Sequence, residues 1–153
     1  MVKKCFEKRI DNIIPLIMFT SLRLEALADH HIFKPFGFTS ASFRIMALID
    51  RLGPSSPSRI IELLGSGKSN LTQRLGFMEK SGLVKKDRED GDGRRVVVSL
   101  TPYGQQRYHE ALAVAQEYNR HLESIFDGPE LETYFQFMEK LNVNIGKSKA
   151  FSC

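Results

Sequence analysis

Residues 68–104 carry the feature that most restricts the fold, because the spacing of their apolar residues changes partway along. In KSNLTQRLGFMEK, Leu71, Leu75 and Met78 recur at intervals of four and three, the spacing of a helix with one buried face. Gly82 ends this pattern, and LVKK, the polar DREDGDG and RRVVVSL follow. Two short strands around an acidic, glycine-rich tip predict a β-hairpin directly after the helix.

The residues before this helix predict two more helices. Thr39 or Ser40 is expected to cap a helix that runs to Leu52, where the loop GPSSP interrupts the pattern. Ser56 before Pro57 is typical of a second helix start, and Gly65 is expected to end that short helix. A helix-turn-helix followed by a hairpin is a winged helix.

Longer helical patterns flank this region at 6–33 and 105–126, and a last helix is expected to begin at Pro129. Pro15 is expected either to kink the first helix or to lie in its first turn. The predicted fold is therefore mainly α with a small β-hairpin wing: a winged helix-turn-helix flanked by N- and C-terminal helices. The expected division is 1–38, 39–104 and 105–153.

The stretch ELLGSGKSNL, residues 62–71, raises the alternative of a nucleotide-binding loop, because Gly67-Lys68-Ser69 resembles the end of a phosphate-binding motif. That motif needs a glycine five positions before its Gly-Lys pair and a strand leading in. Glu62 occupies the glycine position, and the residues before it read as helix. We therefore interpret Gly65 to Gly67 as a tight turn between two helices, with Ser66 or Gly67 opening the second.

Composition limits the remaining classes. The net charge is +4, and residues 39–103 hold eleven Lys and Arg against seven Asp and Glu, which favours a polyanionic partner. No apolar run approaches twenty residues, so we expect neither a membrane span nor a signal peptide, and a cytoplasmic protein. Cys5 and Cys153 form no metal-ligand spacing, and the histidines share none either, so no metal site and no cofactor are predicted.

The face of helix 68–80 opposite its buried stripe carries small and amide side chains. Amides such as Asn70 and Gln73 read adenine edges in a DNA major groove, while Lys68 and Ser69 reach phosphates. A plain solvated face is the alternative. The two arginines carried by the hairpin tip favour DNA, since an arginine there can reach an adjacent minor groove.

LTQRLGFMEKSGLVKKDREDGDGRRVVVSLTPYG, residues 71–104, resembles the signature of the MarR family of bacterial and archaeal regulators. The resemblance is carried by Met78-Glu79, Gly82-Leu83-Val84, Asp92-Gly93-Arg94, Leu100-Thr101 and Gly104, and the order of elements agrees over 39–104. It implies a homodimer built from the N- and C-terminal helices, which binds a roughly palindromic operator in double-stranded DNA.

The resemblance also implies roles for particular residues. Arg94 would be the wing arginine, and Asp92 would orient it by a charge-assisted hydrogen bond. The family often has a basic residue where this chain has Gln73 and Phe77, so the base contacts are expected to differ. The expected DNA-binding residues are Lys68, Ser69, Asn70, Thr72, Gln73, Arg74, Arg94 and Arg95.

Regulation leaves three hypotheses open. A repressor released by a small aromatic or amphipathic ligand is favoured, with ligand-binding candidates Arg23, His30, His31 and Lys34. A thiol-redox regulator of the same fold would use Cys5, which lies near lysines. A general DNA- or protein-binding module is the third. Because no catalytic triad is readable at close spacing, an enzyme is retained only as an alternative from another class.

Overall fold

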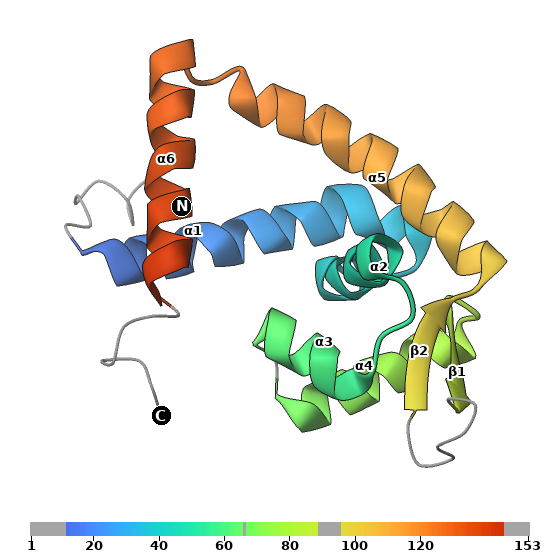
Figure 1. Cartoon of the computed structure of the whole chain (residues 1–153). Helices are drawn as coiled ribbons and strands as arrows, with labels where there is room; N and C mark the ends of the chain where they lie inside the picture. Colours follow the sequence, from blue (N-terminus) through green and yellow to red (C-terminus); the bar gives the residue numbers. More distant parts are fainter. Residues whose placement is uncertain (1–11, 66, 89–95, 146–153) are drawn as a thin grey trace. The chain divides into compact units, whose positions relative to one another are not determined.

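The computed structural model describes residues 12–65, 67–88 and 96–145 (Figure 1). It has a mainly helical architecture with one two-stranded antiparallel sheet among these residues, which confirms the predicted fold class. The contacts divide the chain into two compact units, 1–114 and 115–153, and each is described by itself. No helix in the described part of the chain is long and apolar enough to cross a membrane.

The first helical segment has three parts. Helix α1, Ile13–Ala28, has Pro15 in its first turn, where the missing N–H is tolerated. A wider π-helical turn, η2 (Asp29–Phe33), and a short 3₁₀ turn, η3 (Lys34–Phe36), follow it. None of the 16 residues of α1 is buried, whereas η2 turns two apolar side chains inward, Ile32 and Phe33.

The next three helices begin where the capping residues predict. Helix α2, Ser40–Leu52, follows Thr39, whose hydroxyl accepts a hydrogen bond from the Ser42 N–H. Helix α3, Pro57–Leu64, follows Ser56, whose hydroxyl accepts from the Arg59 N–H, and ends at Gly65 with φ +62°. Helix α4, Lys68–Lys80, opens after Gly67. These features confirm the predicted helix-turn-helix.

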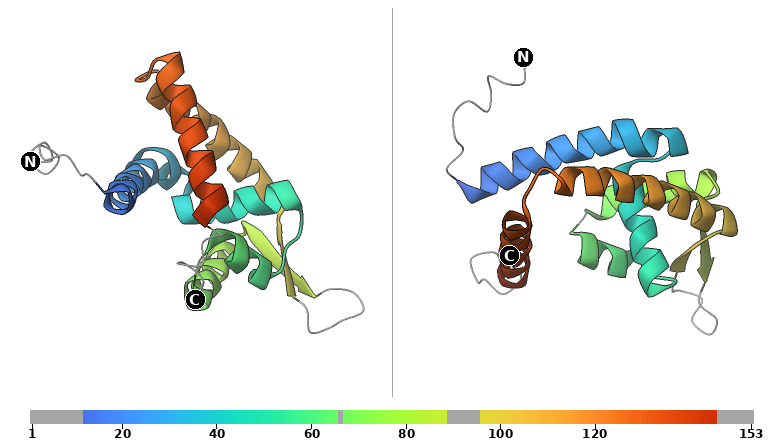
Figure 2. Two further views of the ribbon diagram at one scale, coloured as in Figure 1. Left: turned by 60° about the vertical axis from the view of Figure 1, so that its left-hand side comes forward. Right: turned by 90° about the horizontal axis from the view of Figure 1, so that it is seen from above.

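A hairpin follows α4. Strand β1, Val84–Arg88, pairs antiparallel with β2, Val96–Leu100, and the two strands run side by side in both views of Figure 2. Their register pairs Val84 with Leu100 and Arg88 with Val96. Ser55, in the loop between α2 and α3, exchanges two backbone hydrogen bonds with Val98, at 3.0 and 2.9 Å. That bridge, which the sequence did not predict, fastens the hairpin to the helix-turn-helix.

Helix α5, Pro102–Glu123, starts three residues before the predicted boundary because Thr101 caps it. The Thr101 hydroxyl accepts from the Gly104 N–H at 2.9 Å and donates to the Gly82 carbonyl at 2.5 Å. Helix α6, Gly128–Ile145, lies in the second unit. Asp127 and Glu130 form a reciprocal capping box at its start, with N···O distances of 2.8 and 3.0 Å.

The core of the first unit joins α2, α3, α4, the hairpin and the start of α5. Helices α2, α3 and α4 and both strands each contribute at least one large, fully buried side chain to this core. Helix α5 contributes the buried residues Tyr108 and Ala111. This core holds α4 with one face inward and the other outward. The fully buried apolar side chains are Ile45, Met46, Ile60, Met78, Val84 and Val98.

Candidate nucleic-acid interface

Packing decides which face of α4 is presented to a partner. Leu71, Leu75 and Met78 are 3%, 2% and 0% exposed, as their spacing predicts. The opposite face therefore points away from the core, and Ser69 and Gln73 on it are exposed. The helix is preceded by a turn and flanked by a hairpin, which is the arrangement that presents one helix to a DNA major groove.

The beginning of α4 offers unused hydrogen-bond donors. Gly67 has no side chain to cap the helix, and no side chain of the described residues caps its first backbone N–H groups. Lys68 and Ser69 are exposed, and neither side chain is hydrogen-bonded to another residue in the described ranges. A positive side chain beside free N–H groups at the positive end of a helix dipole suits a phosphate oxygen.

Three of the expected DNA-binding side chains, those of Asn70, Thr72 and Arg74, are engaged within the protein. The half-buried Arg74 donates to the Thr39 hydroxyl at 2.9 Å and to the Asn70 side-chain oxygen at 3.4 Å. The Thr72 hydroxyl donates to the Lys68 carbonyl at 2.9 Å. Arg74 therefore links the recognition helix to the start of α2, a contact across 35 residues that the sequence did not reveal.

The first strand of the hairpin is basic, but its lysines are paired. Lys85 lies 2.7 Å from Asp87, and Lys86 lies 2.6 Å from Glu79 of α4. The second pair ties the hairpin to the recognition helix. The predicted wing residues Asp92, Arg94 and Arg95 lie outside the described residues, as does Cys5.

Phe77 is a candidate interface residue that was not among the DNA-binding residues expected from the sequence. It is the one large apolar side chain exposed on α4 in the described chain, at 51%. It lines an open depression of about 290 Å³ together with five polar residues from α4, α2 and the cap of α2. These are Thr39, Ser42, Asn70, Gln73 and Arg74.

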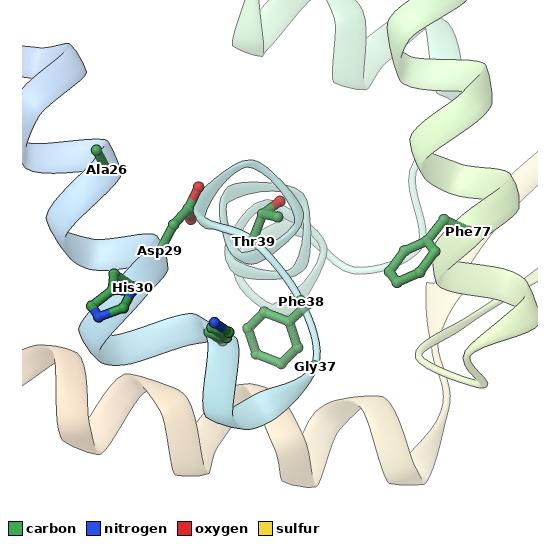
Figure 3. A pocket seen from close by; sticks show the side chains of 8 residues that line it. Ala26, Asp29, His30, Gly37, Phe38, Thr39 and Phe77 are labelled. Atoms are coloured by element: carbon green, nitrogen blue, oxygen red, sulfur yellow. The ribbon is translucent and has the colours of Figure 1, made fainter.

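A second hollow, of about 470 Å³, is also lined by Thr39 and Phe77 (Figure 3). Its apolar side chains include Phe38 and Phe77, and its candidate partners for a carboxylate are His30 and Lys34, both expected from the sequence. Arg23 and His31, the other two candidates, do not line it. Asp29 at its edge is engaged, since its carboxylate accepts the Ser40 N–H at 2.5 Å.

The first unit also holds a buried tyrosine. Tyr108 of α5 packs against Phe43 of α2 with ring centroids 5.2 Å apart. Burial raises the pKa of the Tyr108 hydroxyl, and the negative charge of Asp50 raises it further. The shift keeps Tyr108 neutral and marks it as part of the core rather than of the interface.

Comparisons with known proteins place this geometry in a family. A model described as MarR family matches residues 36–95. The chain is 32% identical over 95 residues to the HTH-type transcriptional regulator PecS of Dickeya dadantii (strain 3937), covering 58% of this chain and 57% of PecS. It is 28% identical over 104 residues to the transcriptional regulator HosA of Escherichia coli O111:H-, covering 67% of this chain and 76% of HosA.

Solved structures share the fold over most of the chain. A probable transcriptional regulator from Pseudomonas aeruginosa superposes with a TM-score of 0.76 at 26% identity, covering 86% of this chain and 97% of that one. A mutant MarR from E. coli complexed with operator DNA gives 0.76 at 22% identity, covering 88% and 99%. Residues 36–95, which hold the helix-turn-helix and the start of the hairpin, therefore match the MarR family, and the likeness of fold extends beyond them over most of the chain.

Proposed function

We propose that this protein is a dimeric transcriptional regulator that binds double-stranded DNA through α4 and the hairpin, and that a small ligand releases it from a roughly palindromic operator. The observation that carries the proposal is the outward face of α4, where Lys68, Ser69 and Gln73 lie exposed above a buried apolar stripe. Side chains on such a face can contact base edges and phosphates without any change in the core.

Charge and relatives support DNA as the partner. The net charge of +4 favours a polyanion. PecS and HosA are named as transcriptional regulators, and the similar E. coli MarR structure holds operator DNA. Repression is the favoured direction of control, because a bound dimer on an operator blocks access to the DNA beneath it.

Exposed apolar side chains support a homodimer. Along α1, eight large apolar side chains are between 42% and 62% exposed, which is unusual for a helix that faces water. In the second unit, five large apolar residues of α6 are 46% to 52% exposed. Burial of both surfaces against a second copy would remove them from water, and two-fold symmetry would match a palindromic operator.

The 470 Å³ hollow supports control by a ligand. Its aromatic walls, the His30 imidazole and the Lys34 ammonium group suit a small aromatic or amphipathic acid. For release, the ligand must prefer a conformation in which the two recognition helices miss successive major grooves, roughly 34 Å apart. Control through oxidation of Cys5 is the second candidate, which a thiol near lysines favours.

Selection of bound sequences from a random DNA pool tests the proposal most directly. We expect enrichment of an inverted repeat, a dimer mass by gel filtration, and affinity that falls steeply with salt concentration. A monomer that enriches no sequence and shows no salt dependence would contradict the proposal and return the enzyme class to consideration.

A further inference from the structure

The position of Phe77 on α4 requires an explanation that the fold does not supply. The buried stripe of the helix is complete without it, since Leu71, Leu75 and Met78 fill the core. The Phe77 ring is nevertheless left half in water, on a helix whose other exposed residues in the described chain are polar or small. Leaving a phenyl ring in water has a free-energy cost, which a contact made on binding would recover.

Phe77 is close to the side chains that are suited to reading adenine. It lines one depression with Gln73 and Asn70, which lie about one and two helical turns before it. At 100° per residue, Gln73 and Phe77 point about 40° apart, and their Cα atoms are separated by about 6 Å along the helix axis. Base pairs are stacked about 3.4 Å apart, so the two side chains address base pairs about two steps apart.

The chemistry of Phe77 selects one base-edge group. The major groove presents donors and acceptors for which a phenyl ring has no complement, and one apolar group, the C5-methyl of thymine. Phenylalanine contacts with that methyl are an established mode of direct readout. An arginine or lysine at the same position would instead take a guanine or a phosphate.

We infer that Phe77 is a specificity-determining residue that packs on a thymine C5-methyl group in each half-site, about two base pairs from the adenine addressed by Gln73. The inference rests on the proposed function and adds to it that the operator half-site contains A·T pairs at this spacing. Phe77 also borders the 470 Å³ hollow. The experiment must therefore distinguish a role of Phe77 in DNA readout from a role in ligand binding alone.

The test uses the full chain and the operator obtained by selection, with single thymines replaced by deoxyuridine in both half-sites. Deoxyuridine keeps the base pair and removes only the methyl group. We expect one thymine position at which the replacement weakens wild-type binding by about fourfold for each half-site, the factor that corresponds to one buried methyl group. Phe77→Ala should bind both DNAs equally, and Phe77→Leu should retain part of the discrimination.

Leu52→Ala is the matched control, because Leu52 is 54% exposed at the end of α2, away from this face. The Leu52→Ala variant should distinguish thymine-containing from deoxyuridine-containing operator DNA as the wild type does. Equal sensitivity to deoxyuridine in wild type and in folded Phe77→Ala overturns the inference and leaves DNA binding intact. Failure to enrich any DNA sequence overturns the proposed function and the inference together.

Discussion

The side chains of α4 fall into two groups by what they touch. Lys68, Ser69 and Gln73 are exposed with no hydrogen bond from their side chains to the rest of the described chain, so they are available to a partner. Arg74 is half-buried, and its guanidinium is held by Thr39 and Asn70. We therefore infer that Arg74 positions the recognition helix, while the first group makes the contacts with DNA.

Lys68 and Gln73 should affect DNA binding differently. Lys68→Ala should weaken operator and non-operator DNA alike and reduce the salt slope by about one unit, because it removes one phosphate contact. Gln73→Ala should reduce discrimination between sequences. Fluorescence anisotropy at several salt concentrations measures both effects. Tight ATP binding that disappears in Lys68→Ala would instead support the nucleotide-loop reading of Gly67-Lys68-Ser69.

Tyr108 should make the free energy of unfolding depend on pH in the alkaline range. Its pKa in the folded state is raised by burial and by Asp50, whereas the unfolded value is about 10. The stabilisation is therefore complete below pH about 10 and is lost as pH rises through the folded pKa. Urea unfolding between pH 8 and 11 should show a steeper loss for wild type than for Tyr108→Phe, and parallel curves would contradict this.

The elements of the first unit are joined at a few close contacts between backbones. The bridge between Ser55 and Val98 fastens the hairpin to the loop before α3. At the start of α5, Thr101 caps the helix and also donates to the Gly82 carbonyl after α4. These contacts fix the two strands relative to α4, so the proposed function would have both elements presented to DNA as one surface.

Gly104 should be indispensable for the close packing of the start of α5 against the backbone of Leu83. A Cβ atom at Gly104 would lie 1.8 Å from the Leu83 carbonyl oxygen, and that backbone cannot rotate away. Gly104→Ala should therefore lower the free energy of unfolding by about 1–3 kcal/mol or more, measured by urea denaturation.

The matched control is Gly76→Ala in α4, where a Cβ would meet nothing within 4 Å. It should raise stability by about 1 kcal/mol, because alanine favours helix over glycine. A Gly104→Ala protein as stable as wild type would show that the close approach to Leu83 is not a constraint.

Arg94, which the sequence predicts at the hairpin tip, should contribute to DNA affinity. Arg94→Ala should weaken operator binding by about 1–3 kcal/mol, since the side chain is expected to contact the minor groove or its phosphates. Arg95→Ala should have a smaller effect, because neighbours along a strand point to opposite sides. Binding of folded variants at one salt concentration, with circular dichroism as the folding check, measures this. Unchanged affinity in Arg94→Ala would contradict the predicted role.

At the scale of the whole molecule, the proposed function requires two chains. Each compact unit contributes a helix whose large apolar side chains remain exposed, α1 in the first and α6 in the second. A dimer built on these helices would hold two copies of α4 at a set spacing. Any ligand that changes that spacing would change operator affinity without touching DNA.

A small aromatic acid should release the protein from its operator by changing the spacing of the two copies of α4. With benzoate as the probe, we expect release in wild type and in Cys5→Ser, and a weaker response in Lys34→Ala, which loses a cation from the 470 Å³ hollow. Peroxide should release neither protein. Release by peroxide in wild type alone would overturn the preference for a ligand and establish Cys5 as the sensor.

Local chemistry in the sequence determined the elements and their order. Ser56 before Pro57 begins a helix and Gly65 ends it because the cap and the left-handed turn depend on neighbouring residues only. The spacing of Leu71, Leu75 and Met78 likewise determined which face of α4 is buried. The candidate interface, Lys68 to Gln73, followed from that face.

Tertiary packing decided what lies beside these elements. The contact of Arg74 with Thr39, the bridge of Ser55 with Val98 and the approach of Gly104 to Leu83 join residues that are 35, 43 and 21 positions apart. Periodicity describes one element at a time and contains no distance between elements. Only the packed core sets those distances, which is why it gave Arg74 a partner within the protein and left Phe77 exposed beside Gln73.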